Sequence, residues 1–521
     1  MAKRKRDVAD SGVSLKAART QKEQVLSIPK PARRGEVLAS KSKDEAARLP
    51  VNGKVNGAAK EASTSISGSS DMTTVQVITG SYERVLHGFT AAFPQSLVTR
   101  QEATKETEEP KVSFADNFLF NAHASAIRCL ALSPLSDESS KVTLATGATD
   151  ERINLYSLST APSKPSKSKP TLPTLHGNTI SENSRNKELG SLLHHSSSIT
   201  ALYFPTRSKL LSSAEDSTIA IVRTRDWTPL STIKAPIPTP QGRPSGDTAA
   251  PGEVPSGIND FAVHPSMKLM VSVSKGEKSM RLWNLVTGKK AGVLNFGREI
   301  LTAVGEGRFG TGEGRKVAWD KEGEEFAVAF ERGVAVFGID CKAKGKVEPT
   351  PRTKLHQMKY LSSDSSSNIL AVSTEDGRLL FYDTSSTTPL SESNKDDIPP
   401  CALVAQLGGP AAGITQRIKD FEVLSVDIGF LIVTGSSDGT VRPWFIQHTD
   451  LDSPKRTANP EEGFTAKQIG KPIGTYSTNS RITCLKAFIM TGKAEDAEEE
   501  EEVVVEDKSD DSSSGSDSNS E

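Results

Sequence analysis

One pattern recurs along this sequence and limits what the chain can fold into. An acidic residue is followed six positions later by an aromatic or bulky aliphatic residue, and this pair occurs seven times. The acids are Glu83, Asp150, Asp216, Glu277, Glu331, Asp376 and Asp438, and their partners, in the same order, are Phe89, Tyr156, Val222, Trp283, Phe337, Tyr382 and Trp444. A sevenfold internal repeat predicts an architecture built from similar units.

The spacing between acid and aromatic is that of a turn followed by a strand. A carboxylate in a tight turn can accept backbone N–H bonds, and an alternating strand then places the two residues at its opposite ends. Short alternating or β-branched runs, such as Ile199–Phe204 (ITALYF) and Lys268–Ser274 (KLMVSVS), fill the region between turns. The sequence therefore predicts an all-β fold, and the seven units predict a seven-bladed β-propeller.

Two histidines precede the first strand of their units. His123 lies in NAHASAIRCLAL and His195 in HHSSSITALYF. A histidine at this place can donate a hydrogen bond to the turn acid of its unit. We expect such a bond to tie one strand connection to the next, with Asp150 and Asp216 as the acceptors.

Composition changes at both ends of the repeat region. Residues 1–70 contain 15 Lys/Arg against 7 Asp/Glu, and residues 491–521 contain 2 Lys against 13 Asp/Glu. Such segments bury too little apolar surface to offset the entropy of ordering. We therefore expect a disordered basic tail over residues 1–72, the propeller over residues 73–490 and a disordered acidic tail over residues 491–521.

The two ends of the repeat region complement each other. Val75–Thr79, Arg84–Thr90 and Ser113–Phe120 give the first unit three strands with none before them. Arg481–Met490 has the pattern of a first strand with none after it. Pairing of the N- and C-terminal strands would close the ring and remove open sheet edges.

Several segments are predicted to depart from regular blades. Residues 160–187, 236–256, 297–314 and 384–400 make their units longer than the ~40–45 residues of a four-stranded blade, and we expect them to be loops outside the blades. Pro443 falls inside a predicted strand although it cannot donate a hydrogen bond. We expect its nitrogen to face the outer strand of its blade.

No motif predicts a catalytic, cofactor-binding or metal-binding site. The eight histidines and four cysteines do not cluster at metal-ligand spacings. Gly305–Gly310 (GEGRFG) matches a dinucleotide-binding pattern, but it lacks the strand-to-helix context, so a flexible insertion is expected. No run reaches the ~18 apolar residues of a membrane helix. We expect a protein that is not an enzyme, has no cofactor and does not enter a membrane.

Both tails carry candidate interaction segments. Lys3, Arg4, Lys5 and Arg6 form a compact basic run that suits nuclear import or RNA contact, with a solvated charge cluster as the alternative. The acidic tail contains serines among its acids, whose phosphorylation would add negative charge. It could attract basic partners or act only as a solubilising segment.

Beyond the general repeat, four segments resemble a known family. The region from Thr74 to Met490 resembles WD repeats. Within it, Gly80–Phe89 (GSYERVLHGF), Leu144–Leu158 (LATGATDERINLYSL), Gly190–Phe204 (GSLLHHSSSITALYF) and Met280–Phe296 (MRLWNLVTGKKAGVLNF) resemble the PAK-interacting WD-repeat proteins. The fungal members of that family are Mak-type factors. Its animal members carry a basic C-terminal tail, whereas this chain is basic at its N-terminus and acidic at its C-terminus.

The resemblance implies a function. It implies a non-catalytic scaffold in nucleolar assembly of the large (60S) ribosomal subunit, including pre-rRNA processing. Its partners would be assembly factors, ribosomal proteins and pre-rRNA of the pre-60S particle, with the chain a monomer in that complex. The alternative is a signalling adaptor that binds and inhibits a PAK-type kinase. Chromatin or histone binding, or a cryptic enzyme with a residue cluster at the ring mouth, is a third hypothesis.

Overall fold

The structure is a computed structural model. It describes residues 72–95, 112–136, 139–162, 179–180, 183, 185–237, 256–307, 310–361, 368–387, 397–451 and 467–491. The chain divides into two units, Met1–Ile66 and Ser67–Glu521. The first unit lies outside the described residues, so the fold described below belongs to the second. The two predicted tails lie outside the described residues as well, apart from Met72 and Thr491.

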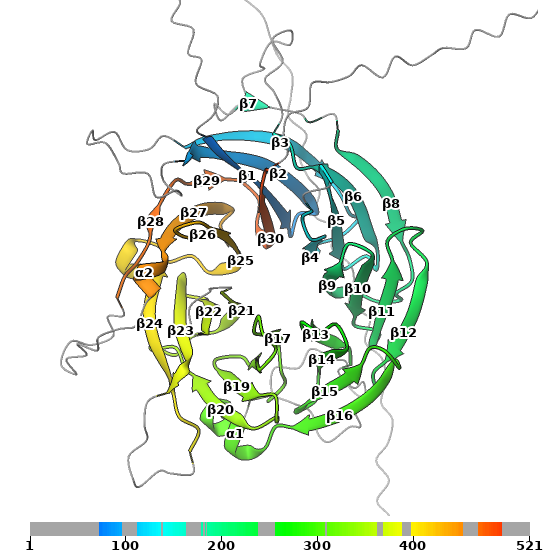
Figure 1. Ribbon diagram of the computed structural model, residues 1–521, viewed down its shortest axis with the longest axis vertical. Coiled ribbons are helices and arrows are strands. Elements are labelled where there is room, and N and C mark those ends of the chain that lie inside the picture. Colours follow the sequence, from blue (N-terminus) through cyan, green and yellow to red (C-terminus); the bar gives the residue numbers. More distant parts are fainter. Residues whose placement is uncertain are drawn as a thin grey trace, which may run out of the picture. The chain divides into compact units, whose positions relative to one another are not determined.

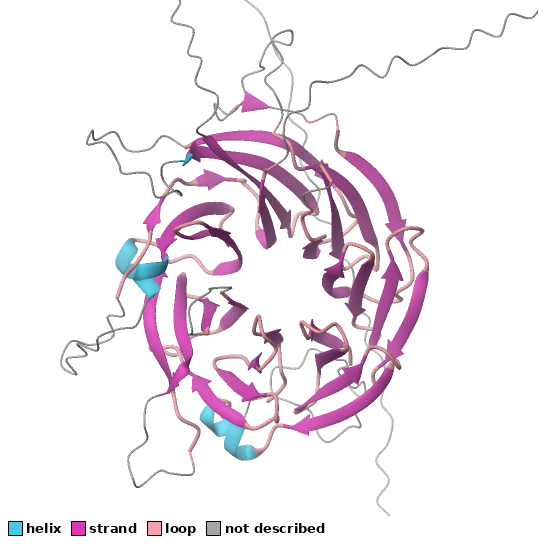
Figure 2. Ribbon diagram, in the orientation of Figure 1, coloured by secondary structure: helices cyan, strands magenta, loops and turns pink. Residues whose placement is uncertain are grey.

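Seven antiparallel sheets, which we call blades 1 to 7, stand around a central axis (Figure 1). Nearly all regular structure is strand (Figure 2). From the inside outward, blade 1 consists of β30 (Ile482–Ile489), β1 (Met72–Ser81), β2 (Val85–Pro94), β3 (Ser113–Asn121) and the short parallel β7 (Thr179–Ile180). Blade 2 consists of β4 (Ile127–Leu132), β5 (Lys141–Ala148), β6 (Ile153–Ser159) and β8 (Lys187–Leu192). Blade 3 consists of β9 (Ile199–Thr206), β10 (Lys209–Ala214), β11 (Thr218–Arg223) and β12 (Pro229–Lys234).

The remaining blades follow in chain order. Blade 4 consists of β13 (Ile258–Val263), β14 (Leu269–Ser274), β15 (Ser279–Asn284) and β16 (Lys289–Asn295). Blade 5 consists of β17 (Lys316–Trp319), β18 (Glu325–Ala329), β19 (Val334–Gly338) and β20 (Ala343–Val347). Blade 6 consists of β21 (Leu355–Tyr360), β22 (Ile369–Thr374), β23 (Arg378–Thr387) and β24 (Cys401–Gly408). Blade 7 consists of β25 (Ile418–Val426), β26 (Gly429–Ser436), β27 (Thr440–Gln447) and a divided outer strand, β28 (Lys471–Pro472) and β29 (Tyr476–Ser477).

Blade 1 is built from both ends of the described region. Its innermost strand, β30, pairs antiparallel with β1, with Val75 opposite Ile489 and Ile78 opposite Lys486. Figure 1 shows β30 beside β1 although about 400 residues separate them in sequence. The last strand therefore completes the first sheet. It pairs with the edge of β1 that would otherwise be open.

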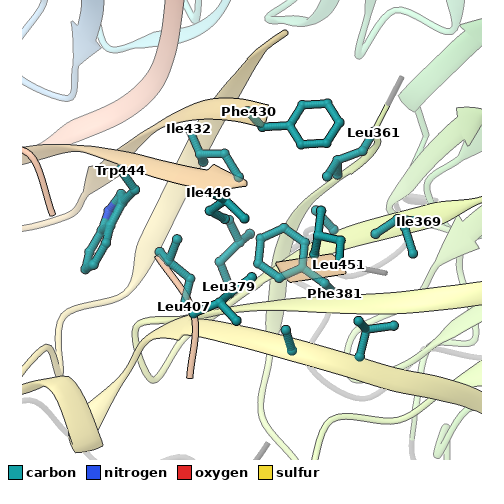
Figure 3. Close-up of a cluster of buried hydrophobic side chains, with 14 of the residues drawn as sticks. Leu361, Ile369, Leu379, Phe381, Leu407, Phe430, Ile432, Trp444, Ile446 and Leu451 are labelled. Atoms are coloured by element: carbon teal, nitrogen blue, oxygen red, sulfur yellow. The ribbon is translucent and has the colours of Figure 1, made fainter. Parts of the chain in front are cut away.

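The core lies between the blades. The second and third strands of each blade are the most buried, as in β18 and β22, where every residue is buried, whereas outer strands such as β12 are largely exposed. Among the described residues, seven apolar clusters each join two neighbouring blades. Figure 3 shows one of them, in which Phe381 and Leu379 of blade 6 face Ile432 and Ile446 of blade 7. Because each sheet is covered on both faces by its neighbours, removing one blade exposes apolar surface on two others.

Two glycines are required in the turns between second and third strands. Gly377 and Gly439 have φ values of 82° and 86°. A Cβ at Gly439 would lie 2.7 Å from the carbonyl oxygen of Ser480, and one at Gly377 would lie 2.8 Å from that of Ile414. Both the backbone conformation and the close approach of the neighbouring segment therefore demand glycine.

The predicted insertions are partly structured. Residues 297–314 contain α1 (Arg298–Ala303), so the expectation of a plain loop there is wrong. Its Ala303 is buried, and Ile300 and Leu301 pack on a cluster of blades 4 and 5, which explains why a helix forms. A second short helix, α2 (His448–Leu451), directly follows β27 of blade 7.

Pro443 lies in β27 without breaking a ladder bond. Its carbonyl oxygen accepts a hydrogen bond of 2.9 Å from the backbone nitrogen of Ile473, on the side of the outer strand. In a β-strand the N and O atoms of one residue point to the same side, so the proline nitrogen also faces outward. The expected orientation is confirmed, and the missing N–H falls where the outer strand is divided into β28 and β29.

Candidate functional site

One face of the ring carries the turns between second and third strands, and we call it the turn face. In six blades, a backbone N–H of this turn bonds to the residue just before the inner strand. Examples are Thr149 N to Ala126 O at 3.1 Å, Lys275 N to Gly257 O at 2.8 Å and Ser437 N to Arg417 O at 3.0 Å. The starts of the inner strands and the repeat acids therefore meet on the same face.

Two blades hold the turn acid with a buried histidine. In blade 2, His123 Nδ1 lies 3.1 Å from each carboxylate oxygen of Asp150, and its Nε2 lies 2.7 Å from Thr146 Oγ1. Burial lowers the pKa of His123 although Asp150 acts against that shift. The imidazole therefore bridges the turn and the second strand.

Blade 3 repeats this network with more hydrogen bonds. His195 Nδ1 lies 3.1 Å from Asp216, and its Nε2 lies 2.8 Å from Ser212 Oγ. Asp216 also accepts bonds from the backbone N–H groups of Ser196 and Thr218. Burial would raise the pKa of Asp216, but the bonds from His195, Thr218 and Ser196 outweigh it and lower the pKa. This carboxylate is a rigid, ionised part of the turn.

The other repeat acids are held without histidine. Glu277 pairs with Arg281, and Asp376 pairs with Arg378 at 2.7 Å. Glu331 lies 3.3 Å from Arg315 and 3.2 Å from Lys354.

Two acids rely mainly on backbone donors. Glu83 accepts from the backbone N–H of Arg481 at 2.9 Å, and Asp438 accepts from the backbone N–H and hydroxyl of Thr440 at 2.9 and 2.6 Å. The structure thus places all seven acids in turns, with different partners. They stay apart around the ring and do not converge on one site.

The partners six positions after the acids are all buried. They belong to the third strands: Phe89, Tyr156, Val222, Trp283, Phe337, Tyr382 and Trp444. Both tryptophans donate their indole N–H, Trp283 to Ser272 Oγ at 2.8 Å and Trp444 to Thr434 Oγ1 at 3.1 Å. Burial raises the pKa of Tyr156 to about 12. These side chains are part of the core and are not available to a ligand.

Blade 1 contains a network that the repeat pattern did not predict. His87 Nε2 lies 2.8 Å from Asp116 Oδ1, and the Tyr476 hydroxyl donates to the same carboxylate. Tyr476 belongs to blade 7 and stacks on Phe89 with ring centroids 4.0 Å apart. His87 and Asp116 lie on the paired strands β2 and β3. Asp116 falls outside the turn spacing, and the closure of the ring brings Tyr476 to this pair.

The inner strands enclose a central channel of about 900 Å³. Deep in its wall, Glu422 Oε2 lies 2.8 Å from both Lys359 Nζ and Lys486 Nζ, which joins blades 6, 7 and 1. Burial alone would raise the pKa of Glu422, but the two ammonium groups outweigh it and lower the pKa. The single carboxylate between two ammonium groups therefore holds the inner strands of three blades together.

Two further channel acids join neighbouring inner strands. Asp260 Oδ2 accepts from Val317 N at 3.1 Å, and Asp420 Oδ2 accepts from Leu485 N at 2.9 Å. Each carboxylate therefore bonds to the backbone of the next blade. The repeated pattern I-x-D-F-x-V in Ile258–Val263 and Ile418–Val423 marks both positions and could have identified them from sequence.

The described residues offer no group of three or more His, Cys, Asp or Glu placed to hold a metal ion. Within the same residues, no helix has the length and apolar character needed to cross a membrane. The basic run Lys3, Arg4, Lys5 and Arg6 lies outside the described residues.

Comparison with known proteins agrees with this architecture. Residues 186–222 match the WD domain, G-beta repeat family. Over 426 residues the chain is 24% identical to a p21-activated protein kinase-interacting protein 1-like protein of Danio rerio, covering 81% of this chain and 83% of the relative. It is 27% identical to Protein MAK11 of Saccharomyces cerevisiae over 401 residues, covering 72% and 78% of the two chains. It is 28% identical to Shk1 kinase-binding protein 15 of Schizosaccharomyces pombe over 127 residues, covering 24% of this chain and 33% of the relative.

Proposed function

Because the chain is a WD-repeat propeller protein homologous to the p21-activated kinase-interacting proteins and to Mak11, we propose that it is a non-catalytic scaffold in nucleolar assembly of the large ribosomal subunit. In this role it joins a pre-60S particle and supports pre-rRNA processing. The observation that carries the proposal is the similarity to Mak11 over most of both chains. The resemblance to Mak-type assembly factors supplies the biological role.

The architecture suits a scaffold. The core is shared between neighbouring blades and closed by β30, so the ring presents loops and strand edges on a fixed frame. The seven acids remain apart around the ring. The acid, histidine and hydroxyl groups that do meet, in blades 2 and 3, have buried histidines and hydroxyls and tie the turn to the second strand. A rigid ring of this kind can hold several macromolecules at once without chemistry of its own.

The tails complete the proposal. The basic tail, with Lys3, Arg4, Lys5 and Arg6, would support nuclear import and add salt-dependent affinity for RNA phosphates. Replacing these four residues by alanine should move a fluorescently tagged protein out of the nucleolus while leaving its melting temperature unchanged. A matched replacement of Lys41, Lys43, Lys54 and Lys60 should not change its location. An unchanged nucleolar location of the first variant would refute this role for the basic run.

The second candidate function is a kinase-binding adaptor. The names of the zebrafish and fission-yeast relatives state that those proteins interact with kinases. An adaptor that restrains a PAK-type kinase would use the same rigid ring. It would not need RNA or the nucleolus.

Affinity purification distinguishes the two functions. The tagged full-length protein is recovered from its own cells at moderate salt, and the bound proteins and RNA are identified. Large-subunit rRNA precursors together with assembly factors are expected. Recovery of a kinase or of histones without precursor RNA would contradict the scaffold proposal and support the adaptor or the chromatin hypothesis instead.

A further inference from the structure

Basic side chains gather where the channel opens on the turn face. They lie at the starts of the inner strands of blades 5, 6, 7 and 1: Arg315, Lys354, His356, Arg417, Lys419 and Arg481. Arg315, Lys354, His356 and Lys419 line the channel itself. Arg315 and Lys354 share Glu331, at 3.3 and 3.2 Å. Arg417 lies 3.5 Å from Glu375, whose backbone N–H bonds to the carbonyl of Lys354. We call these six residues the basic mouth.

Positive charge exceeds negative charge at the basic mouth. Four acids stand near its five permanent cations: Glu331, Glu375, Glu83 and Glu313, which lines the channel and accepts from the backbone N–H of Gly276 at 2.8 Å. Within the described part of the chain, neither Lys419 nor Arg481 forms an ion pair, and Arg481 packs over the ring of Tyr82.

The crowding of cations changes the titration of the mouth. Burial, followed by the charges of Lys419, Arg417, Lys354 and Arg315, lowers the pKa of His356 to about 3. Its Nε2 atom is buried and has no hydrogen-bond partner among the residues that the structure describes. Burial and the nearby Arg417 and Arg481 also lower the pKa of Lys419. A bound anion would relieve this repulsion.

The opposite half of the same opening is electrically balanced. Arg128 pairs with Glu215 at 2.8 Å, and the Asn259 amide donates to the carbonyl of Gly314 at 2.8 Å. Thr200 and Ser213 bond to each other at 2.8 Å. The excess of positive charge is therefore confined to one side of the channel opening. An anionic ligand is expected to bind on that side, away from the centre of the channel.

We propose that the basic mouth binds an extended, carboxylate-rich peptide segment of a partner protein. The channel volume of about 900 Å³ lies within the range of about 300–1,000 Å³ for ligand pockets. The cations stand at the channel opening, whereas the repeat acids stand in the turns. A peptide entering the channel would meet the cations, while a polynucleotide lying across the face would bring its phosphates against the turn acids. The proposal does not depend on which of the two candidate functions the ring serves.

Binding of a defined acidic peptide tests the proposal. A fluorescein-labelled octaglutamate peptide is titrated with the full-length protein, and binding is followed by fluorescence anisotropy at low ionic strength. Octaglutamine and an eight-nucleotide oligouridylate serve as comparison probes. The test variant is Lys419→Gln with Arg481→Gln, since neither residue leaves an acid unpaired. The matched control is Lys209→Gln with Lys268→Gln, which removes two exposed cations from the opposite face.

We expect octaglutamate to bind and octaglutamine not to bind. The test variant should bind octaglutamate about tenfold more weakly, with the control variant unchanged. If the test variant melts early, Lys419→Gln alone should still weaken binding about threefold. Binding that appears only after truncation behind Thr491, and depends on Lys419, would also support the proposal, with the chain's own acidic segment as the competing occupant. Equal octaglutamate affinities of parent and both variants, or tighter Lys419-dependent binding of oligouridylate, would overturn it.

Discussion

Blades 2 and 3 differ from blades 4 and 7 in how they satisfy one buried hydroxyl group. In blades 2 and 3 the hydroxyl, on Thr146 or Ser212, meets a histidine Nε2 that comes from the loop before the inner strand. In blades 4 and 7 it belongs to Ser272 or Thr434 and meets an indole N–H from the third strand. Each of the four hydroxyls lies in the second strand, directly opposite the residue four positions after the turn acid.

The comparison shows that the two departures from a regular repeat compensate each other. Of these four units, those of blades 2 and 3 lack tryptophan at the position six after the acid and supply a histidine, whereas those of blades 4 and 7 lack the histidine and supply tryptophan. A buried hydroxyl without a partner costs about 1–3 kcal/mol, so one donor or acceptor must be present, but both are not needed. The histidine blades differ in one respect, because their network also fixes the turn acid.

Opening the ring should have the largest effect, because it tests whether either kind of blade is stable without its neighbours. Truncation after Ser480 removes β30, whose Ile482 and Leu485 are fully buried. It exposes the clusters that join blade 1 to blades 7 and 2. We expect loss of cooperative thermal unfolding, followed by circular dichroism, and rapid cleavage by trypsin.

Truncation after Thr491 is the matched control, since it keeps every described strand. Its melting temperature should equal that of the parent. If the protein cut after Ser480 also melted within a few degrees of the parent, the hydroxyl networks would be sufficient to keep single blades folded. Blades of the two kinds could then be compared as separately stable units.

Replacing the turn acid should affect a histidine blade more than a tryptophan blade. Asp216→Asn weakens bonds to His195, Ser196 and Thr218 at once, and we expect a loss of about 2–4 kcal/mol in the free energy of unfolding. Asp438→Asn changes an exposed turn that bonds only to Thr440, so about 1 kcal/mol or less is expected. Urea denaturation of the two variants measures the difference. Equal losses would show that histidine adds nothing to the turn.

Removing the indole donors should have a smaller effect and should separate the two tryptophan blades. In Trp283→Phe, the Ser272 hydroxyl loses its one hydrogen bond among the described residues, and about 2 kcal/mol is expected. In Trp444→Phe, the Thr434 hydroxyl still donates to the carbonyl of Arg442 at 3.1 Å, so about 1 kcal/mol is expected. Thermal unfolding of both variants gives the order.

Double variants provide the control for this pair. Adding Ser272→Ala to Trp283→Phe removes the orphaned hydroxyl and should recover part of the lost stability. Adding Thr434→Ala to Trp444→Phe should not, because that hydroxyl keeps a partner. Recovery of stability in both blades, or in neither, would contradict the idea that the tryptophan stabilises its blade by satisfying this buried hydroxyl.

The sequence alone predicts the contacts between residues that are close to one another in the chain. The acid, the histidine and the aromatic residue lie within about 30 residues of one another, so their spacing predicts the turns and the seven units. The bond between Tyr476 and Asp116, and the contacts of Glu422 with Lys359 and Lys486, span from about 60 to 360 residues. Such contacts depend on ring closure and on the register of neighbouring inner strands, which periodicity alone does not determine. The basic mouth remained hidden for the same reason, since its residues come from four different blades.

The smallest effect concerns pH and separates the two histidine blades from each other. Blade 3 has a second histidine, His194, whose Nε2 lies 2.9 Å from the same Ser212 hydroxyl; blade 2 has Ala122 before His123. Burial, with a smaller contribution from His195, lowers the pKa of His194 to about 4. Because this pKa lies below the ordinary value of about 6.5, the unfolded chain binds the proton more readily. The stabilising contribution is therefore present above pH 6.5 and is lost as the pH falls toward 4. Urea midpoints between pH 7.5 and 4.5 should fall less steeply for His194→Gln than for the parent. Parallel curves would mean that His194 titrates alike in both states, and blades 2 and 3 would then differ only in the number of bonds to the turn acid.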